Sequence, residues 1–386
     1  MKITDVQAFI LQGQQKYENP SGAGEAPGVF QCCLIRVETD EGIVGWSDVE
    51  TQPAVAKACV DAPESGSGMF EGLRSLCLGE DPFETERLWE KMYLGSIYFG
   101  RRGAAIQALS GIDIACWDII GKATRRPLWK LLGGGYRKTV RAYASTLFRP
   151  APDDIREACA GYLKHGFSAI KFGWGVFGQD KKLDESLVRA ARKEIGDNVE
   201  LLVDPGWKVS RSAFDALETA RMLSQYRVFW MEDFMNPEDY EGYARVSEGI
   251  ERGGLGVRVA AGEQEATAAG FRRLIADGRI HVAQPDLTRC GGITVARRIA
   301  WMAREHSIDV CPHAWLTDLL TAASLHVNAT LPRALFLEYN VSSSPMLREI
   351  ITNPVKLNPD GTISVPEGPG LGIEIDEKAV KKYRVA

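Results

Sequence analysis

The sequence predicts an α/β protein in which a (β/α) barrel is capped by a separate α+β domain. Beyond about residue 136, short apolar runs alternate with helical stretches. Each run begins about 24 to 32 residues after the one before, the length of one βα unit. Eight such runs occur, which is the number of strands in a TIM-type barrel. Ahead of them, a hairpin followed by helices indicates a domain of a different class.

The predicted barrel occupies residues 136–354. An open, doubly wound sheet is the alternative arrangement for such βα units, and its most common ligand is a dinucleotide. No Gly-x-Gly-x-x-Gly motif follows the first run, so the barrel is favoured and an NAD-dependent dehydrogenase is not. The eight runs are residues 140–146, 168–174, 200–204, 228–233, 257–263, 281–286, 309–313 and 335–339.

Residues 1–135 form the predicted capping domain. A strand is expected at residues 3–11, and the Gly-, Pro- and Asn-rich residues 12–28 are predicted to form a mobile loop. Residues 30–46 then predict a hairpin around Thr39-Asp40-Glu41-Gly42, because apolar runs flank a sequence with good turn chemistry.

The clearest helix of this domain is predicted from residue 104 to about residue 122, where apolar residues recur on one helical face. Gly133-Gly134-Gly135 marks the end of the domain. Residues 355–386 return to hairpin-like sequence, and we expect this segment to pack back on the capping domain.

Composition excludes several classes of function. A formal net charge of -5 offers no basic surface for nucleic acid or an anionic membrane, and no uninterrupted apolar run reaches the roughly 18 residues of a membrane span. The eight cysteines include no Cys-x-x-Cys pair and lie mostly in apolar stretches, so we expect them to be free thiols buried in the core. No signal-peptide pattern opens the sequence, and we expect a cytoplasmic location.

Three consecutive predicted strands each deliver a carboxylate to the same end of the barrel. The side chains are Asp204, Glu232 and Glu263. The carboxyl ends of barrel strands converge on one face, so these charges should lie close together and repel one another. A hard divalent cation such as Mg²⁺ relieves that repulsion. The sequence therefore predicts a metal site, with buried ion pairs as the alternative.

Other strand ends add groups suited to acid–base chemistry. Lys171 lies on the second strand, Asp286 and His313 end the sixth and seventh, and Glu338 lies on the eighth. A carboxylate beside His313 would fix its tautomer and raise its basicity. Together with Mg²⁺ and a lysine ammonium, this set suits removal of the weakly acidic proton α to a carboxylate. Glu338 is expected to donate a hydrogen bond to the same carboxylate if protonated; pairing with a nearby cation is the alternative.

These residues resemble the enolase superfamily, in its mandelate racemase subgroup. The resemblance covers nearly the whole chain, including residues 41–46, 108–118 and 366–372 as well as the strand ends. It implies a capping domain over a modified barrel, Mg²⁺ as the cofactor and a symmetric homo-oligomer. By the same resemblance Asp204, Glu232 and Glu263 are the Mg²⁺ ligands, Asp286 and His313 are the catalytic dyad, and Glu338 is the electrophilic carboxyl.

One departure from the racemase pattern bears on the reaction. Racemases of this kind carry Lys-x-Lys on the second strand, whereas this chain reads Lys171-Phe172-Gly173 and lacks the second base. One-sided proton removal followed by loss of the β-hydroxyl gives dehydration, as in sugar-acid dehydratases. The galactonate-type relatives have a histidine where this chain has Gly206, so their assignment of the acid does not carry over.

The predicted activity is therefore dehydration of a sugar acid to a 2-keto-3-deoxy acid, with a small carboxylate as the only predicted ligand besides Mg²⁺. An epimerase or cycloisomerase on the same scaffold is the first alternative. A non-catalytic sugar-acid-binding homologue is the second, although no ligand or dyad member is missing. Four residues near the predicted site are candidates for substrate binding: Tyr98, Arg101, Trp174 and Trp315.

Overall fold

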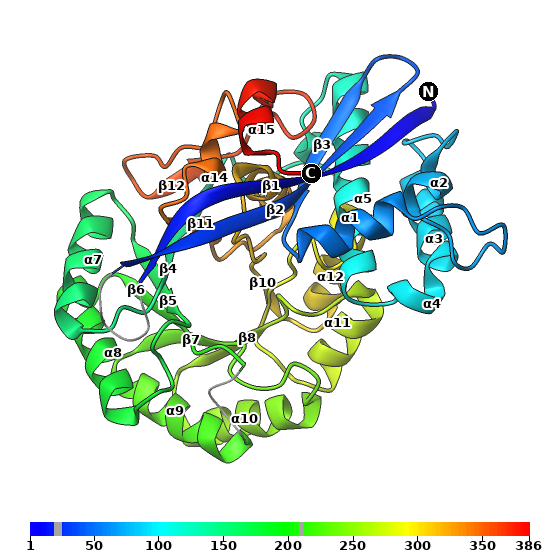
Figure 1. Cartoon of the computed structure of the whole chain (residues 1–386). Coiled ribbons are helices and arrows are strands. Elements are labelled where there is room, and N and C mark those ends of the chain that lie inside the picture. The colour runs from blue at the N-terminus through cyan, green and yellow to red at the C-terminus, as the bar shows by residue number, and fades with distance from the viewer. Residues whose placement is uncertain (19–24, 208–211) are drawn as a thin grey trace.

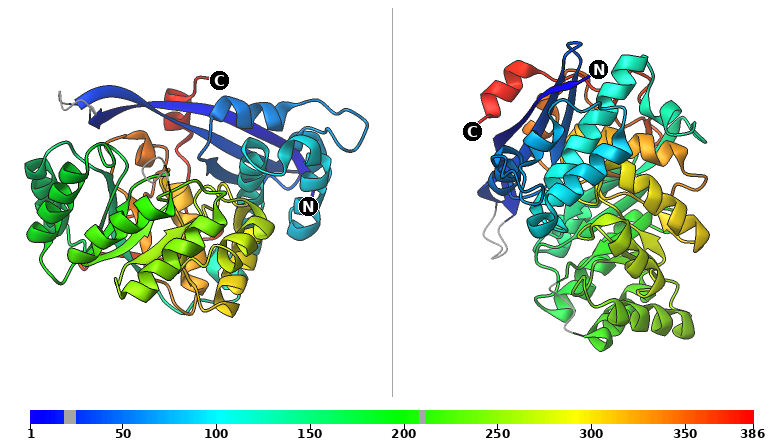
Figure 2. Two further views of the ribbon diagram at one scale, coloured as in Figure 1. Left: turned by 90° about the horizontal axis from the view of Figure 1, so that it is seen from below. Right: turned by 90° about the vertical axis from the view of Figure 1, so that its right-hand side faces the viewer.

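The computed structural model describes residues 1–18, 25–207 and 212–386. They form a barrel of parallel strands ringed by helices, with a sheet of N-terminal strands lying across it (Figures 1 and 2). The predicted fold class, a modified (β/α) barrel with an α+β cap, is confirmed.

The cap contains one antiparallel sheet in the order β1-β2-β3, packed against helices. Its predicted hairpin is present, with Gly42 in the left-handed region at φ 74°. Its strands are β1 (Ile3–Glu18), β2 (Glu25–Thr39) and β3 (Val44–Val49), and its helices are α1 (Pro53–Asp61), α2 (Leu73–Cys77), α3 (Thr85–Gly95), α4 (Ile97–Gly100), α5 (Ala104–Thr124) and α6 (Leu128–Leu131).

The prediction of a mobile loop at residues 12–28 is wrong for the residues that the structure describes. β1 and β2 pair continuously from Gln12 opposite Gln31 to Glu18 opposite Glu25. The Asn, Pro and Gly residues that suggested a loop are concentrated at residues 19–24, outside the described residues, whereas residues 12–18 contain a single glycine. An antiparallel pair of strands provides hydrogen bonds for the backbone N–H and C=O groups of polar residues as well as for those of apolar residues.

Helix α5 is the core of the cap. It is long and apolar enough to cross a bilayer by length and composition, but 89% of its most apolar stretch is buried inside the protein. It packs directly on β3 because Gly45 has no side chain: a Cβ there would lie 2.1 Å from the carbonyl oxygen of Ala115. The close approach requires glycine at this position.

Within the described residues, the barrel has eight parallel strands, each matching one predicted run, and seven helices are interleaved with them. The strands are β4 (Thr139–Leu147), β5 (Ala169–Gly173), β6 (Glu200–Asp204), β7 (Val228–Glu232), β8 (Arg258–Ala261), β9 (Val282–Ala283), β10 (Asp309–Val310) and β11 (Leu337–Asn340). The helices are α7 (Pro152–Lys164), α8 (Lys181–Ile195), α9 (Ala213–Gln225), α10 (Tyr240–Gly253), α11 (Thr267–Ala276), α12 (Gly292–Glu305) and α13 (Asp318–Thr330).

The interior of the barrel is filled by side chains rather than open. One buried residue from each strand or its immediate flank joins a single cluster, in which Trp230 meets Tyr143 and Phe336 edge-on at 5.7 Å between ring centroids. In the described part of the chain no backbone ladder joins β10 to β11; the Cys311 thiol instead donates to the carbonyl oxygen of Phe336 at 3.3 Å. The seam is therefore closed by side chains.

The C-terminal segment contacts both parts of the molecule. It contains α14 (Met346–Glu349), β12 (Thr362–Ser364) and α15 (Glu377–Tyr383). β12 pairs antiparallel with β4 of the barrel, whereas the backbone N–H of Val385 donates to Ile10 in the sheet of the cap at 2.9 Å. The segment thus runs from the barrel back to the first strand.

Asp118 joins three separate segments within the protein. One carboxylate oxygen accepts from the backbone N–H of Leu371 in the tail, and the other accepts from Trp46 on β3 and from the Lys122 ammonium. The Asp118 side chain is almost completely buried. Both backbone donors would lose their partner without it.

We expect Asp118→Ala to lower the free energy of unfolding by about 2–3 kcal/mol, because buried donors left unpaired carry a desolvation cost. The measurement is urea denaturation followed by circular dichroism. Asp61→Ala is the matched control, since Asp61 also forms an i,i+4 pair with a lysine, Lys57, at the surface and in the reverse order along the helix. It should cost at most about 0.5 kcal/mol; equal losses in the two variants would contradict the assignment.

Candidate active site

Three buried carboxylates meet at the carboxyl end of the barrel. Asp204 ends β6, Glu232 ends β7, and Glu263 lies two residues beyond β8. An oxygen from each lies within 4.8 Å of the others. The structure therefore brings together the three side chains that the sequence predicts as metal ligands.

Indole hydrogen-bond donors hold two of these carboxylates, and the cluster carries more negative than positive charge. The indole N–H of Trp174 donates to Asp204 at 3.0 Å, and that of Trp230 donates to Glu232 at 2.9 Å. Burial and then repulsion from Glu232 raise the pKa of Asp204 well above its usual range. Burial likewise raises the pKa of Glu232, against the attraction of Lys171. The cluster holds more negative charge than the protein alone neutralises.

The chemistry of these donors fits a hard divalent cation. All three groups offer carboxylate oxygens, which are the ligands that Mg²⁺ and Ca²⁺ prefer. Among the residues that the structure describes, no thiol or imidazole belongs to this set. A cation here would remove the repulsion that raises the pKa of Asp204.

Lys171 on β5 lies between two carboxylates. Its ammonium is 2.6 Å from Glu232 Oε1 and 2.8 Å from Glu338 Oε1, and the side chain is buried. Burial disfavours the charged form, but the charges of Glu232 and Glu338 prevail and raise the pKa of Lys171 well above its usual range. Lys171 is thus a fixed positive charge, suited to hold an anion rather than to accept a proton.

His313 and Asp286 form the predicted pair. His313 Nδ1 lies 2.7 Å from Asp286 Oδ2, and the other oxygen of Asp286 accepts from the backbone and hydroxyl of Thr288. This leaves Nε2 facing the carboxylates, 3.0 Å from Glu263 Oε2. Burial lowers the pKa of His313, but the charges of Glu263 and Glu338 and the bond to Asp286 outweigh it and raise the pKa well above its usual range.

Glu338 lies beside two cationic side chains, Lys171 and His313. Its oxygens accept from Ser145 Oγ and the backbone N–H of Ala314, each at 2.7 Å. Burial favours the neutral acid, but attraction to Lys171 and His313 prevails and lowers the pKa to about 2. Both oxygens of Glu338 thus accept hydrogen bonds, and its role as an electrophile stays a prediction.

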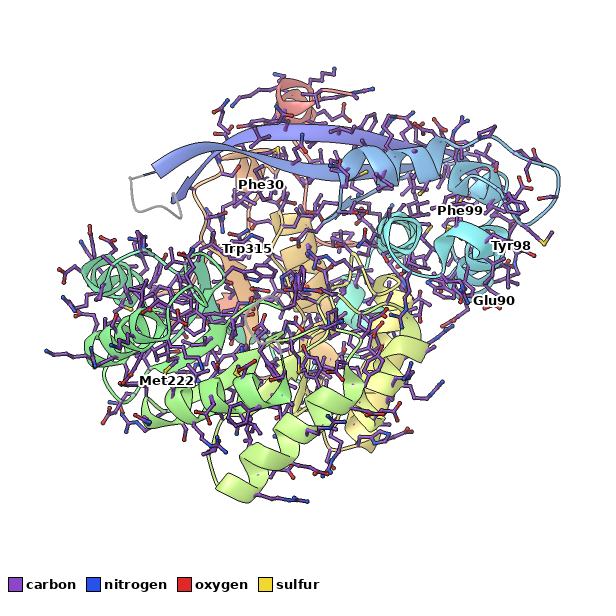
Figure 3. The ribbon with its side chains drawn as sticks, turned by 60° about the horizontal axis from the view of Figure 1, so that its bottom comes forward. Phe30, Glu90, Tyr98, Phe99, Met222 and Trp315 are labelled. Carbon is purple, nitrogen blue, oxygen red and sulfur yellow. The ribbon has the colours of Figure 1, made fainter. Side chains whose placement is uncertain are left out.

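A cavity of about 530 Å³ opens onto this cluster. Trp174 and Trp315 line it, as expected for substrate-binding residues, and Figure 3 shows Trp315 between the cap and the barrel. Tyr98 and Arg101 are not among the described residues that line the cavity. Tyr98 is 66% exposed and stacks on Phe70 at the far side of the cap. The structure does not bring these two residues to the site.

The cavity has two further charged residues: Glu50, within residues 47–52, a segment of the cap that the sequence places over the site as an expectation, and Arg289, which the sequence analysis did not single out. Glu50 directly follows β3 of the cap, and Arg289 follows Asp286 by three residues. Their side chains pair at 2.8 Å, and Arg289 also donates to the carbonyl oxygen of Glu263 at 3.2 Å. Arg289 could have been predicted from the sequence because it follows Asp286 by only three residues. The hydrophobic pattern of the cap does not indicate that the Glu50 side chain reaches the barrel.

Comparison with known proteins agrees with this geometry. The family model described as "Enolase C-terminal domain-like" matches residues 154–379, and "Mandelate racemase / muconate lactonizing enzyme, N-terminal domain" matches residues 26–133. The chain belongs to the enolase superfamily.

Relatives within the family process sugar acids. A D-galactarolactone cycloisomerase of Agrobacterium fabrum is 31% identical, covering 100% of this chain and 99% of its own. An arabinonate dehydratase of Saccharolobus solfataricus is 30% identical over 94% of this chain and 92% of its own. The crystal structure of a 3,6-anhydro-D-galactonate cycloisomerase from Zobellia galactanivorans has a TM-score of 0.86 at 28% identity, covering 100% of both chains.

We expect MgCl₂ to raise the melting temperature relative to EDTA, because a ligand that binds only the folded state stabilises it by about 2.7 kcal/mol at 100 times its Kd. The measurement is thermal unfolding by circular dichroism, with NaCl at equal ionic strength as the salt control. Glu232→Gln should abolish the shift, and the surface variant Glu251→Gln should retain it. A shift unchanged in Glu232→Gln would place the cation elsewhere.

Proposed function

We propose that this protein is a Mg²⁺-dependent enzyme that removes the proton α to the carboxylate of a sugar acid and eliminates an oxygen from the β-carbon. The observation that supports this most directly is the position of His313. Its Nδ1 is held by Asp286 and its Nε2 lies 3.0 Å from the carboxylate cluster. A base is thereby aimed at the place where a bound carboxylate would lie.

Asp204, Glu232 and Glu263 would hold the Mg²⁺. When bound, the cation would stabilise the negative charge that develops on the substrate carboxylate as its α-proton leaves. The Lys171 ammonium faces the same region from β5 and would pair with a carboxylate oxygen of the substrate. Since Lys171 is held charged by two neighbours, it would stabilise the anion without exchanging protons.

His313 would act as both base and acid. A cation held by Glu263 would offset the negative charge that raises the pKa of His313. The neutral imidazole would then accept the C2 proton at Nε2, while its Nδ1–H continues to donate to Asp286. The electrons of the broken C2–H bond form a C2–C3 double bond as the C3 oxygen departs. The imidazolium would return its proton to that oxygen, which leaves as water. The resulting enol would tautomerise to a 2-keto-3-deoxy acid.

Cycloisomerisation is the second candidate, and two relatives favour it. A 3,6-anhydro acid carries an ether oxygen on C3, the carbon β to the carboxylate. The same elimination would then open a ring instead of releasing water, and no residue of the mechanism would change. Epimerisation is less well supported, because Gly173 supplies no second base on β5.

We expect His313→Asn to reduce turnover by at least about 10²-fold, the usual contribution of a positioned acid–base group. Binding of Mg²⁺ should persist, since no metal ligand is removed. Product formation is measured as 2-keto acid trapped by semicarbazide. His165→Asn, at an exposed position on the end of α7, is the control and should retain full activity. Near-normal turnover in His313→Asn would remove this residue from the mechanism.

Substrate screening separates the two reactions. Aldonic and aldaric acids test dehydration, and lactones and 3,6-anhydro acids test ring opening, each assayed with MgCl₂ in D₂O. Dehydration or ring opening yields a 2-keto acid. A C2-inverted acid containing deuterium, without any keto product, would instead establish epimerisation.

A further inference from the structure

Trp174 is bonded to Asp204 through both its backbone and its side chain. The backbone N–H of Trp174 donates to the carbonyl oxygen of Asp204 at 2.8 Å, and its indole N–H donates to Asp204 Oδ2 at 3.0 Å. Trp174 also has φ 48°, in the left-handed region that residues with side chains rarely adopt. Trp174 thus keeps an unfavourable backbone conformation at the position from which its indole bonds to Asp204.

Two glycines make room for the arrangement. A Cβ on Gly206 would lie 2.9 Å from the Trp174 ring, so the indole lies directly over the Gly206 backbone. A Cβ on Gly173 would lie 3.1 Å from the Asp204 side chain. Gly173 stands where the racemase pattern has its second lysine, and Gly206 stands where the galactonate-type relatives have a histidine. In this chain their surroundings are occupied by the Trp174–Asp204 pair.

The pair lies on the opposite side of the carboxylate cluster from the base. Asp204 comes from β6, next to β5 and Trp174, whereas Glu263 follows β8 and contacts His313. Trp174 also lines the cavity. The cluster is therefore supported by an indole at one end and faced by an imidazole at the other.

We propose that Trp174 is a positioning residue that sets the orientation of Asp204 for a divalent cation, a role that rests on the proposed function. Asp204 Oδ1 accepts from the backbone N–H of Gly206 at 3.0 Å, so donors on both oxygens fix the plane of the carboxylate. Hydrogen-bond partners of metal ligands orient those ligands and strengthen binding. Loss of the indole N–H leaves Asp204 with one fixed oxygen instead of two.

The test measures cation binding without turnover. Mn²⁺ is titrated into the full chain, and free Mn²⁺ is followed by electron paramagnetic resonance. Trp174→Phe keeps an aromatic ring and removes the N–H donor, and we expect its Kd to rise about 10-fold or more. Trp315→Phe is the matched control, because Trp315 lines the same cavity and, within the residues that the structure describes, makes no hydrogen bond to Asp204, Glu232 or Glu263. Its Kd should equal that of the unmodified chain.

A second measurement separates positioning from packing. In Trp174→Phe the Mg²⁺ concentration for half-maximal activity should rise about as much as the Kd for Mn²⁺, and saturating Mg²⁺ should recover the activity that the variant loses at low Mg²⁺. Gly206→Ala crowds the indole and also strains the backbone at φ 78° whose N–H donates to Asp204 Oδ1, so it should weaken Mn²⁺ binding through both donors. These results would support the proposal.

The possible failures are distinct. A Trp174→Phe chain that folds normally and binds Mn²⁺ within two-fold of the unmodified chain would overturn the role of Trp174 alone. If Trp174→Phe does not fold, unchanged Mn²⁺ binding by Gly206→Ala would overturn it. An unmodified chain that binds no Mn²⁺ would overturn the proposed function together with this inference.

Discussion

Crowding of buried negative charge at one end of the barrel is the constraint on which the rest of the site depends. Glu338 and Asp286 each have fixed hydrogen-bond donors and a cationic neighbour. Within the described residues Asp204 has no ion pair, Lys171 is divided between Glu232 and Glu338, and His313 is divided between Glu263 and Asp286. Uncompensated charge of this kind is costly to bury, and a site that tolerates it is suited to a cation.

The cap contributes to this charge balance as well as covering the barrel. Glu50 at the end of β3 pairs with Arg289, which also contacts the carbonyl oxygen of Glu263. Two residues earlier, Asp48 accepts from the backbone N–H of Thr317 at 3.1 Å, in the loop that follows His313. Contacts from one short stretch of the cap therefore reach both the carboxylate cluster and the segment that carries the base.

The strand-end residues could be located from sequence because a barrel strand fixes which end faces the site. Asp204 and Glu232 end apolar runs of the expected length, and spacing alone placed them together. Contacts between domains were not predictable in this way: Glu50 reaches the barrel only through the docking of β3, and Tyr98 stacks on Phe70 away from the cavity. The protonation of Glu338 depends on Lys171 and Ser145, neighbours that only the three-dimensional arrangement reveals.

The order of the strands has a consequence for how the chain reaches this state. β4 pairs with β5, which follows soon after it, but its other parallel neighbour is β11, and the bonded side chains Ser145 and Glu338 are 193 residues apart. Such distant pairing slows folding because a long loop must close first. During synthesis, one edge of β4 stays unpaired until β11 has been made, after nearly the whole barrel. Partly synthesised chains therefore expose an unpaired strand that can aggregate.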